Sequence, residues 1–130
     1  MQLDAATLTG ATGSATITVG DADTAIAAGS GDLPVLATPR MIALMEQAAC
    51  GALAPFLPPG ATSVGVRVDV RHTAPTAVGV RVTARARVSE VSGSRVMFEV
   101  SAEQELDGVG EPIGTGTHTR VVVDRAAFPQ

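Results

Sequence analysis

The chain has 130 residues, which is room for a single domain covering residues 1–130, and it carries a formal net charge of −4. A net negative charge argues against the basic face that nucleic-acid binding needs, and an aromatic content of only 2% argues against a base-stacking platform. Prolines and Glu46 interrupt the apolar stretch 41–66, which argues against a membrane-spanning helix. A single cysteine and an N-terminus unlike a secretion signal predict a cytoplasmic protein.

The first 36 residues are weakly patterned, and one long helix follows them. Alternation predicts a strand at Ser14–Val19, and Thr24–Ala28 can form a single helical turn. The long helix is predicted to begin at Thr38, whose hydroxyl would cap it, with Pro39 at the first helical position and Pro55 ending it. Its residues are apolar on nearly every side, so we expect the helix to be buried.

After Gly60 the hydrophobic period changes to two, which is typical of strands with one apolar face. Four such strands are predicted, around residues 64–70, 78–88, 96–102 and 115–123. The dipeptides that begin at Ser92 and at Asp107 suit hairpin turns, so the pairing should be largely antiparallel. The predicted fold class is therefore α+β, with a long antiparallel sheet against one central hydrophobic helix.

Two ionisable residues interrupt the apolar pattern of these elements. Glu46 is the only charged residue between Arg40 and Arg67, and its neighbours three and four positions away on the helix are apolar. It either reaches solvent or a subunit boundary, or it is a carboxylate held in a site. Counting by two from Val64 places His72 inward at the end of its strand, as a hydrogen-bonded core residue or as a catalytic base. A helix packed on that face would bring the two side chains together.

The other candidate residues have simpler interpretations. Thr38 is explained as a helix cap, although a helix N-terminus can also stabilise an oxyanion. His118 shares a strand face with Arg120 and is expected in solvent or at an interface. Cys50 is expected to be a structural thiol in the buried helix. Two histidines and one cysteine, widely spaced, form no metal-binding motif, and no glycine-rich phosphate loop precedes a helix.

Three separated segments are similar to segments of the fluoroacetyl-CoA thioesterase-like family, which has the hotdog fold. They are VLATPRMIALMEQAAC (Val35–Cys50), VRHTAP (Val70–Pro75) and IGTGTHTR (Ile113–Arg120). The resemblance implies a hotdog fold, in which the sheet wraps around the central helix, and a catalytic set formed by Thr38, Glu46 and His72. It further implies that the Gly65 N–H binds the thioester carbonyl. Residues Asp32–Leu36 lack the aromatic gate of the family's fluoroacetate-specific member, so a different short or branched acyl group is expected.

The same resemblance implies hydrolysis of an acyl-CoA thioester to a free acid and CoA, by a homodimer with its site near the subunit boundary. CoA is part of the substrate, so no separate cofactor is implied. On this hypothesis His72 is the general base or acid, Glu46 orients it, and Thr38 attacks or positions water. Alternatively Glu46 itself attacks and forms a mixed anhydride. The anionic CoA needs local arginines, among which Arg120 is assigned to substrate binding together with Gly65. The other candidates are Arg40, Arg85 and Arg87.

Three other functions stay open at the level of the sequence. The same fold can bind an acyl-CoA or another apolar ligand without turnover. A dehydratase acting on acyl thioesters is a second alternative, but Asp69, three residues before His72, falls on the opposite strand face. A structural dimer, whose polar core residues only satisfy hydrogen bonds, is the third.

Overall fold

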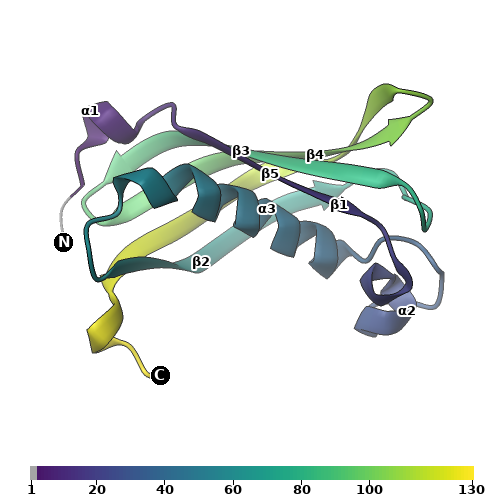
Figure 1. Cartoon of the computed structure of the whole chain (residues 1–130), viewed down its shortest axis with the longest axis horizontal. Coiled ribbons are helices and arrows are strands. Elements are labelled where there is room, and N and C mark those ends of the chain that lie inside the picture. The colour runs from purple at the N-terminus through teal and green to yellow at the C-terminus, as the bar shows by residue number, and fades with distance from the viewer. Residues whose placement is uncertain (1–2) are drawn as a thin grey trace.

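One long helix, α3 (Thr38–Leu53), lies along one face of a twisted five-stranded antiparallel sheet (Figure 1). The computed structural model describes residues 3–130. In chain order the other elements are α1 (Ala5–Leu8), β1 (Thr12–Thr18), α2 (Ala25–Ala28), β2 (Ala61–His72), β3 (Arg81–Ser92), β4 (Arg95–Leu106) and β5 (Val109–Asp124). The strand order across the sheet is β1-β3-β4-β5-β2, so β1 and β2 are its edges. This arrangement confirms the predicted α+β class.

Hairpin turns join β3, β4 and β5, the second at the predicted dipeptide and the first one residue later than predicted, because Ser92 still pairs with Arg95. Gly93 begins the first turn with a φ of 61°. Asp107 and Gly108 form the second, and both have left-handed backbones, with φ of 52° and 76°. Such turns match the twist of the strands they join. The strand predicted at Ser14–Val19 is β1, whereas α1 has no counterpart in the sequence prediction.

The first turn of α3 differs from the sequence prediction in its capping residue. The residue before the helix is Ala37, whose backbone is extended and whose side chain makes no capping hydrogen bond. Thr38 is instead the first helical residue, so its prediction as a cap is wrong, because its hydroxyl contacts His72 on β2 rather than its own helix. Pro39 follows in the first turn, where its missing N–H breaks no intrahelical bond. Pro55 comes just after the helix end, as predicted.

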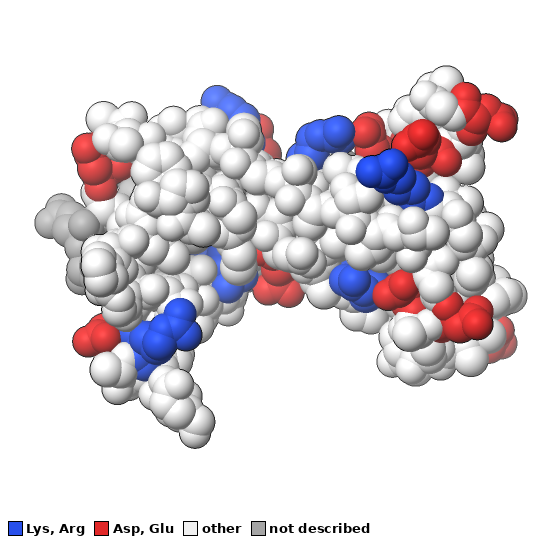
Figure 2. Space-filling model, in the orientation of Figure 1, with Lys and Arg blue, Asp and Glu red and all other residues white. Residues whose placement is uncertain are grey.

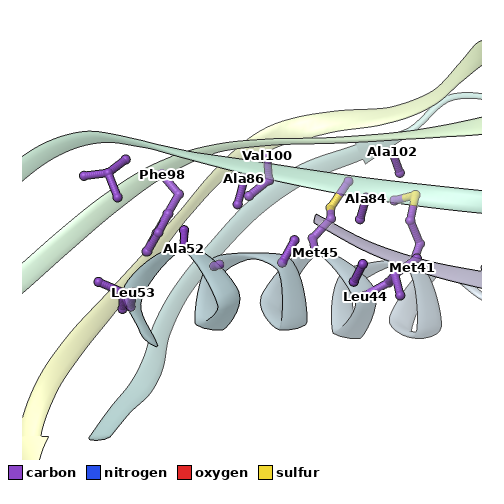
Figure 3. Packing of buried hydrophobic residues seen from close by; sticks show 14 of the residues in the cluster. Met41, Leu44, Met45, Ala52, Leu53, Ala84, Ala86, Phe98, Val100 and Ala102 are labelled. Carbon is purple, nitrogen blue, oxygen red and sulfur yellow. The ribbon is translucent and has the colours of Figure 1, made fainter. Parts of the chain in front are cut away.

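Only one side of α3 is buried, so the prediction that the helix is buried rather than lying on a surface is correct for that side alone. Figure 3 shows side chains of the helix, including Met45 and Leu53, against residues of the sheet such as Phe98. The buried helical residues are Met41, Leu44, Met45, Ala48, Ala49, Ala52 and Leu53. The sheet covers one side of the helix only, and on the other side Gln47 and Cys50 are exposed. Cys50 is therefore not the buried thiol that the sequence predicts.

A glycine in the edge strand β1 lets that strand touch the helix backbone. A Cβ atom built on Gly13 would overlap the Ala48 carbonyl oxygen and lie 2.5 Å from the Ala52 nitrogen. These are main-chain atoms inside a helix, so they cannot move aside as the end of a flexible side chain can. The small residue thus fixes how closely β1 and α3 pack.

A β-bulge between Gly65 and Arg67 interrupts the register of β2 against β5. On one side of the bulge His72 pairs with Gly114, and on the other Gly65 pairs with Arg120. Because the extra residue shifts the alternation, Gly65 joins His72 on the side facing α3, and a count by two along the whole strand fails. The bulge places a glycine beneath the middle of the helix.

The alternation along β5 was predicted with the wrong face inward. His118 is 2% exposed and Arg120 is 7% exposed, so neither faces solvent. Their neighbours on the same face include Gly114 and Gly116, which add no apolar side chains to the pattern. On the face toward the helix, the polar His118 and Arg120 therefore lie between these two glycines and the buried Val122.

Candidate active site

The first residue of α3 and the last residue of β2 meet at one end of the helix. Thr38 Oγ1 and His72 Nδ1 are 2.7 Å apart, which is hydrogen-bonding distance. They border a cavity of about 280 Å³, whose other lining residues include Val35, Leu36 and Pro75. A hydroxyl hydrogen-bonded to an imidazole beside a cavity is the arrangement in which a histidine can activate an oxygen nucleophile.

The protonation state of His72 suits it to accept a proton. Burial lowers its pKa below the usual 6.5, because a charged imidazolium is poorly solvated there. The ring is therefore neutral at pH 7, and Nδ1 can accept the hydrogen bond of the Thr38 hydroxyl. His72 Nε2 is buried and has no hydrogen-bond partner within residues 3–130. A buried nitrogen of this kind normally has a hydrogen-bond partner.

Glu46 lies in a different cluster, farther along α3. Its Oε2 atom is 3.5 Å from Arg120 Nη1 and 4.0 Å from His118 Nε2. The carboxylate side chain is 38% exposed, so it is not fully desolvated. Gly65 lies directly beneath it, since a Cβ atom on that residue would be 2.8 Å from Oε2. A carboxylate thus stands beside a backbone that can approach a ligand closely.

Within one chain the three predicted catalytic residues do not form one group. Thr38 and His72 are in contact, whereas Glu46 is eight residues farther along α3, or about 12 Å along a helix axis. Gly65 and Arg120 lie with Glu46 and not with His72. The expectation that a helix packed on the sheet would bring Glu46 to His72 is therefore not met within a single chain. The catalytic and substrate-binding assignments stay predictions.

Two residues of the Glu46 cluster were not recognised as functional in the sequence. The sequence predicts His118 in solvent or at an interface and predicts no role for Ser63, yet both contact the buried Arg120 side chain. One signal is available, because Gly114 and Gly116, two residues apart on the strand that leads to His118, indicate a strand face that another group approaches closely.

The other arginines considered for CoA binding are engaged in ion pairs. Arg40 contacts Asp23 at 2.8 Å, and Arg85 contacts Glu103 at 2.7 Å. Arg87 lies 3.7 Å from a glutamate on β4. Positive and negative side chains are interspersed on the face shown in Figure 2, so that face carries no continuous basic stripe.

No group of three or more His, Cys, Asp or Glu residues within residues 3–130 is arranged to hold a metal ion. No helix in the same part of the chain is long and apolar enough to cross a membrane.

Comparison with known proteins identifies related sequences and structures. Residues 19–126 match the family described as fluoroacetyl-CoA-specific thioesterase. The fluoroacetyl-CoA thioesterase of Streptantibioticus cattleyicolor is 46% identical over 94 residues, which are 72% of this chain and 65% of that protein. This match thus spans just under two thirds of the relative's length.

Solved structures of similar proteins share the architecture. The fluoroacetyl-CoA thioesterase FlK superposes with a TM-score of 0.80 at 36% identity, over 91% of this chain and 89% of that chain. A variant of FlK solved in complex with acetyl-CoA gives a TM-score of 0.80 at 35% identity, over 89% of both chains. A hot-dog-like protein of Thermanaerovibrio acidaminovorans gives 0.80 at 30% identity, over 92% and 87%. The predicted hotdog fold is confirmed.

Proposed function

The chain belongs to the fluoroacetyl-CoA-specific thioesterase family, and on this basis we propose that it hydrolyses a short or branched acyl-CoA thioester to the free acid and CoA. The observation that carries the proposal is the 2.7 Å contact between Thr38 Oγ1 and His72 Nδ1 at the edge of a cavity. CoA enters as part of the substrate, and we propose no separate cofactor. The single cysteine is compatible with a cytoplasmic location.

The neutral His72 imidazole acts as the base in this mechanism. Its Nδ1 atom accepts the proton of the Thr38 hydroxyl as that oxygen attacks the thioester carbonyl and displaces CoA, and water then hydrolyses the acyl-threonine ester to the free acid. If Thr38 instead orients the attacking water, the proton of that water passes through the Thr38 hydroxyl to Nδ1, and no acyl-enzyme forms. The thiolate of CoA is a good leaving group, so little acid catalysis is needed at its departure. The alternative is attack by Glu46, with a mixed anhydride as intermediate. The backbone N–H of Gly65 is proposed to bind the carbonyl oxygen as negative charge develops on it.

We propose that the complete site forms in a homodimer. The edge strand β2 leaves its outer side unpaired, and Val66 and Val68 on it are 49% and 41% exposed. Exposed apolar edge strands favour pairing with another chain. In a two-fold antiparallel pairing the partner's strand runs in the opposite direction, so the Gly65 end of one strand lies toward the His72 end of the other. This pairing brings the partner's Glu46 toward His72, whose Nε2 makes no hydrogen bond within residues 3–130.

Release of free thiol from a panel of acyl-CoAs tests the activity. The panel contains straight, branched, aromatic and fluorinated acyl groups, and His72→Ala is the control. We expect wild-type protein to release thiol and His72→Ala to lose at least about 10²-fold in kcat. Binding of acyl-CoA without thiol release would contradict the proposal and favour a non-catalytic binding protein. Because Asp32–Leu36 holds no aromatic residue, we expect no preference for the fluoroacetyl group.

Complementation between inactive variants tests the shared site. His72→Ala and Glu46→Gln proteins are unfolded together, refolded as a mixture and assayed. Random pairing makes half of the dimers mixed, and each mixed dimer has one of its two sites intact if the site takes Glu46 from the partner. We then expect about a quarter of the wild-type rate. If both residues act within one chain, the mixture stays inactive. Single-turnover hydrolysis in ¹⁸O-labelled water separately tests attack by Glu46: label in Glu46 supports a mixed anhydride that water opens at the Glu46 carbonyl, whereas label in the product acid alone removes that route.

A further inference from the structure

Arg120 is a buried cation whose hydrogen bonds lead to Glu46. Its side chain is only 8% exposed. Nε donates to Ser63 Oγ at 2.8 Å, and Nη2 donates to the Ser63 carbonyl oxygen at 3.1 Å. These two contacts grip one edge of the planar guanidinium and leave Nη1 pointing at the Glu46 carboxylate, 3.5 Å away. A guanidinium held in this way acts as a fixed donor, because its fork geometry leaves little freedom to rotate.

His118 holds the same Nη1 atom from the other side. Its Nδ1 is 2.7 Å from the Arg67 carbonyl oxygen, which can only accept, so Nδ1 carries the proton. Nε2 of the neutral ring is then an acceptor, and Arg120 Nη1 donates to it at 3.2 Å. The ring also stacks on Phe98, with centroids 6.0 Å apart. Burial is the largest cause that lowers the pKa of His118. The hydrogen bond to the Arg67 carbonyl and the charge of Glu46 oppose it, and the charge of Arg120 adds to it, so the net shift is downward and the neutral acceptor form persists at pH 7.

The β-bulge supplies the two backbone features that this arrangement needs. It turns the Arg67 carbonyl toward His118 Nδ1 and places Gly65 under the carboxylate. The result is that Glu46 Oε2 is contacted from one side by Arg120, while Oε1 makes no hydrogen bond within residues 3–130. One carboxylate oxygen is thus held by the fold, and the other is available to a reacting group.

We infer that Arg120 and His118 are positioning residues for Glu46, and that Arg120 does not bind the phosphates of CoA. The inference rests on the proposed thioesterase function. It replaces the assignment of Arg120 to substrate binding that the sequence suggests. The donors that would meet a phosphate are already directed at Ser63, His118 and Glu46, and the side chain is almost fully buried.

The ratio of kcat to KM effects tests this role. Arg120→Ala is expected to lower kcat about 10- to 100-fold, the size expected when a catalytic group is misplaced by about 1 Å, with KM for the acyl-CoA changed less than about threefold. A low, non-denaturing concentration of guanidinium is expected to restore part of the lost kcat, whereas urea is not. Ser63→Ala, a smaller change, is expected to lower kcat about fivefold with KM unchanged, as one lost hydrogen bond would. Arg81→Ala, which removes an exposed arginine on β3, is the control and should leave both constants unchanged.

A large rise in KM with unchanged kcat would overturn the inference, because it is the signature of substrate binding. Unchanged kcat and KM in Arg120→Ala would overturn it as well. If Arg120→Ala does not fold, Ser63→Ala is judged by the same two criteria. Should the wild-type protein release no thiol, the proposed function fails, and NMR still tests the geometry. His118 is the only histidine in a His72→Gln protein, so ¹⁵N-histidine labelling of that variant reports on this ring alone. We expect the Nδ1–H tautomer at pH 7, and the opposite tautomer or a charged ring would refute the inferred contact of His118 with Arg120.

Discussion

Substitution of Gly65 by alanine tests whether Glu46 must occupy its observed position. The new Cβ atom would lie 2.8 Å from Glu46 Oε2, where ordinary contact begins at 3.4 Å, so the carboxylate must retreat by about 0.6 Å. His118 Cε1 and Arg120 Nη1, at 3.2 and 3.3 Å from the same Cβ, restrict how Glu46 can adjust. The backbone N–H of residue 65 is retained, so its proposed contact with the substrate carbonyl is not removed.

The expected loss is about tenfold in kcat, equivalent to roughly 1.4 kcal/mol of transition-state stabilisation, since a 1 Å misplacement can cost about 100-fold. The free energy of unfolding should change by less than about 1 kcal/mol, because the atom that moves is the end of a flexible side chain. Steady-state thiol release and urea unfolding measure the two quantities. Gly51→Ala is the matched control: it lies on α3 with nothing within 4 Å of its Cβ, so kcat should be unchanged. Gly65→Ala with wild-type kcat would refute the reasoning, and so would equal losses of activity and stability.

Three further predictions concern pH and packing. The pKa of His72 is lowered from 6.5, so kcat/KM should be level near pH 7 and should fall as the pH is lowered and the base is protonated, with a midpoint below 6.5. A pH–rate profile measures this midpoint, and a midpoint above 6.5 would contradict the role of His72 as the base. Both His72 and His118 have folded-state pKa values below 6.5, so the unfolded chain binds protons more readily than the folded chain. Urea unfolding should therefore show the free energy of unfolding decreasing as the pH falls from about 6.5 to the folded-state pKa values, with no further loss from these groups below them. A free energy of unfolding that instead rises as the pH falls over this interval, relative to a variant lacking both histidines, would disprove this. Gly13→Ala should lower the free energy of unfolding by about 1–3 kcal/mol, because the added Cβ meets helix main-chain atoms. If the variant instead unfolds in urea like the wild type, β1 can shift away from α3 and the prediction fails.

Periodicity in the sequence was sufficient to predict the main elements of the fold. The change from helical spacing to a period of two after Gly60 located α3 and the sheet, and the dipeptide beginning at Asp107 located a hairpin. These features are local, because side-chain spacing and backbone preference depend on neighbours in the chain. The isolation of Glu46 from other charges and the place of His72 at a strand end were equally visible, and they singled out the candidate site residues.

The sequence alone did not show which residues of the site meet, because that depends on contacts between distant segments. The bulge at Gly65 shifts the faces of β2, and a count by two carries no sign of an extra residue. On β5, His118 and Arg120 are buried on a face whose preceding positions are Gly114 and Gly116, so the hydrophobic pattern of that stretch does not mark the face as inward. The sheet covers α3 on one side only, which leaves Cys50 exposed. Because α3 runs along the sheet, its length separates the Thr38–His72 contact from the Glu46–Arg120 contact, a division that only the packing of helix on sheet decides.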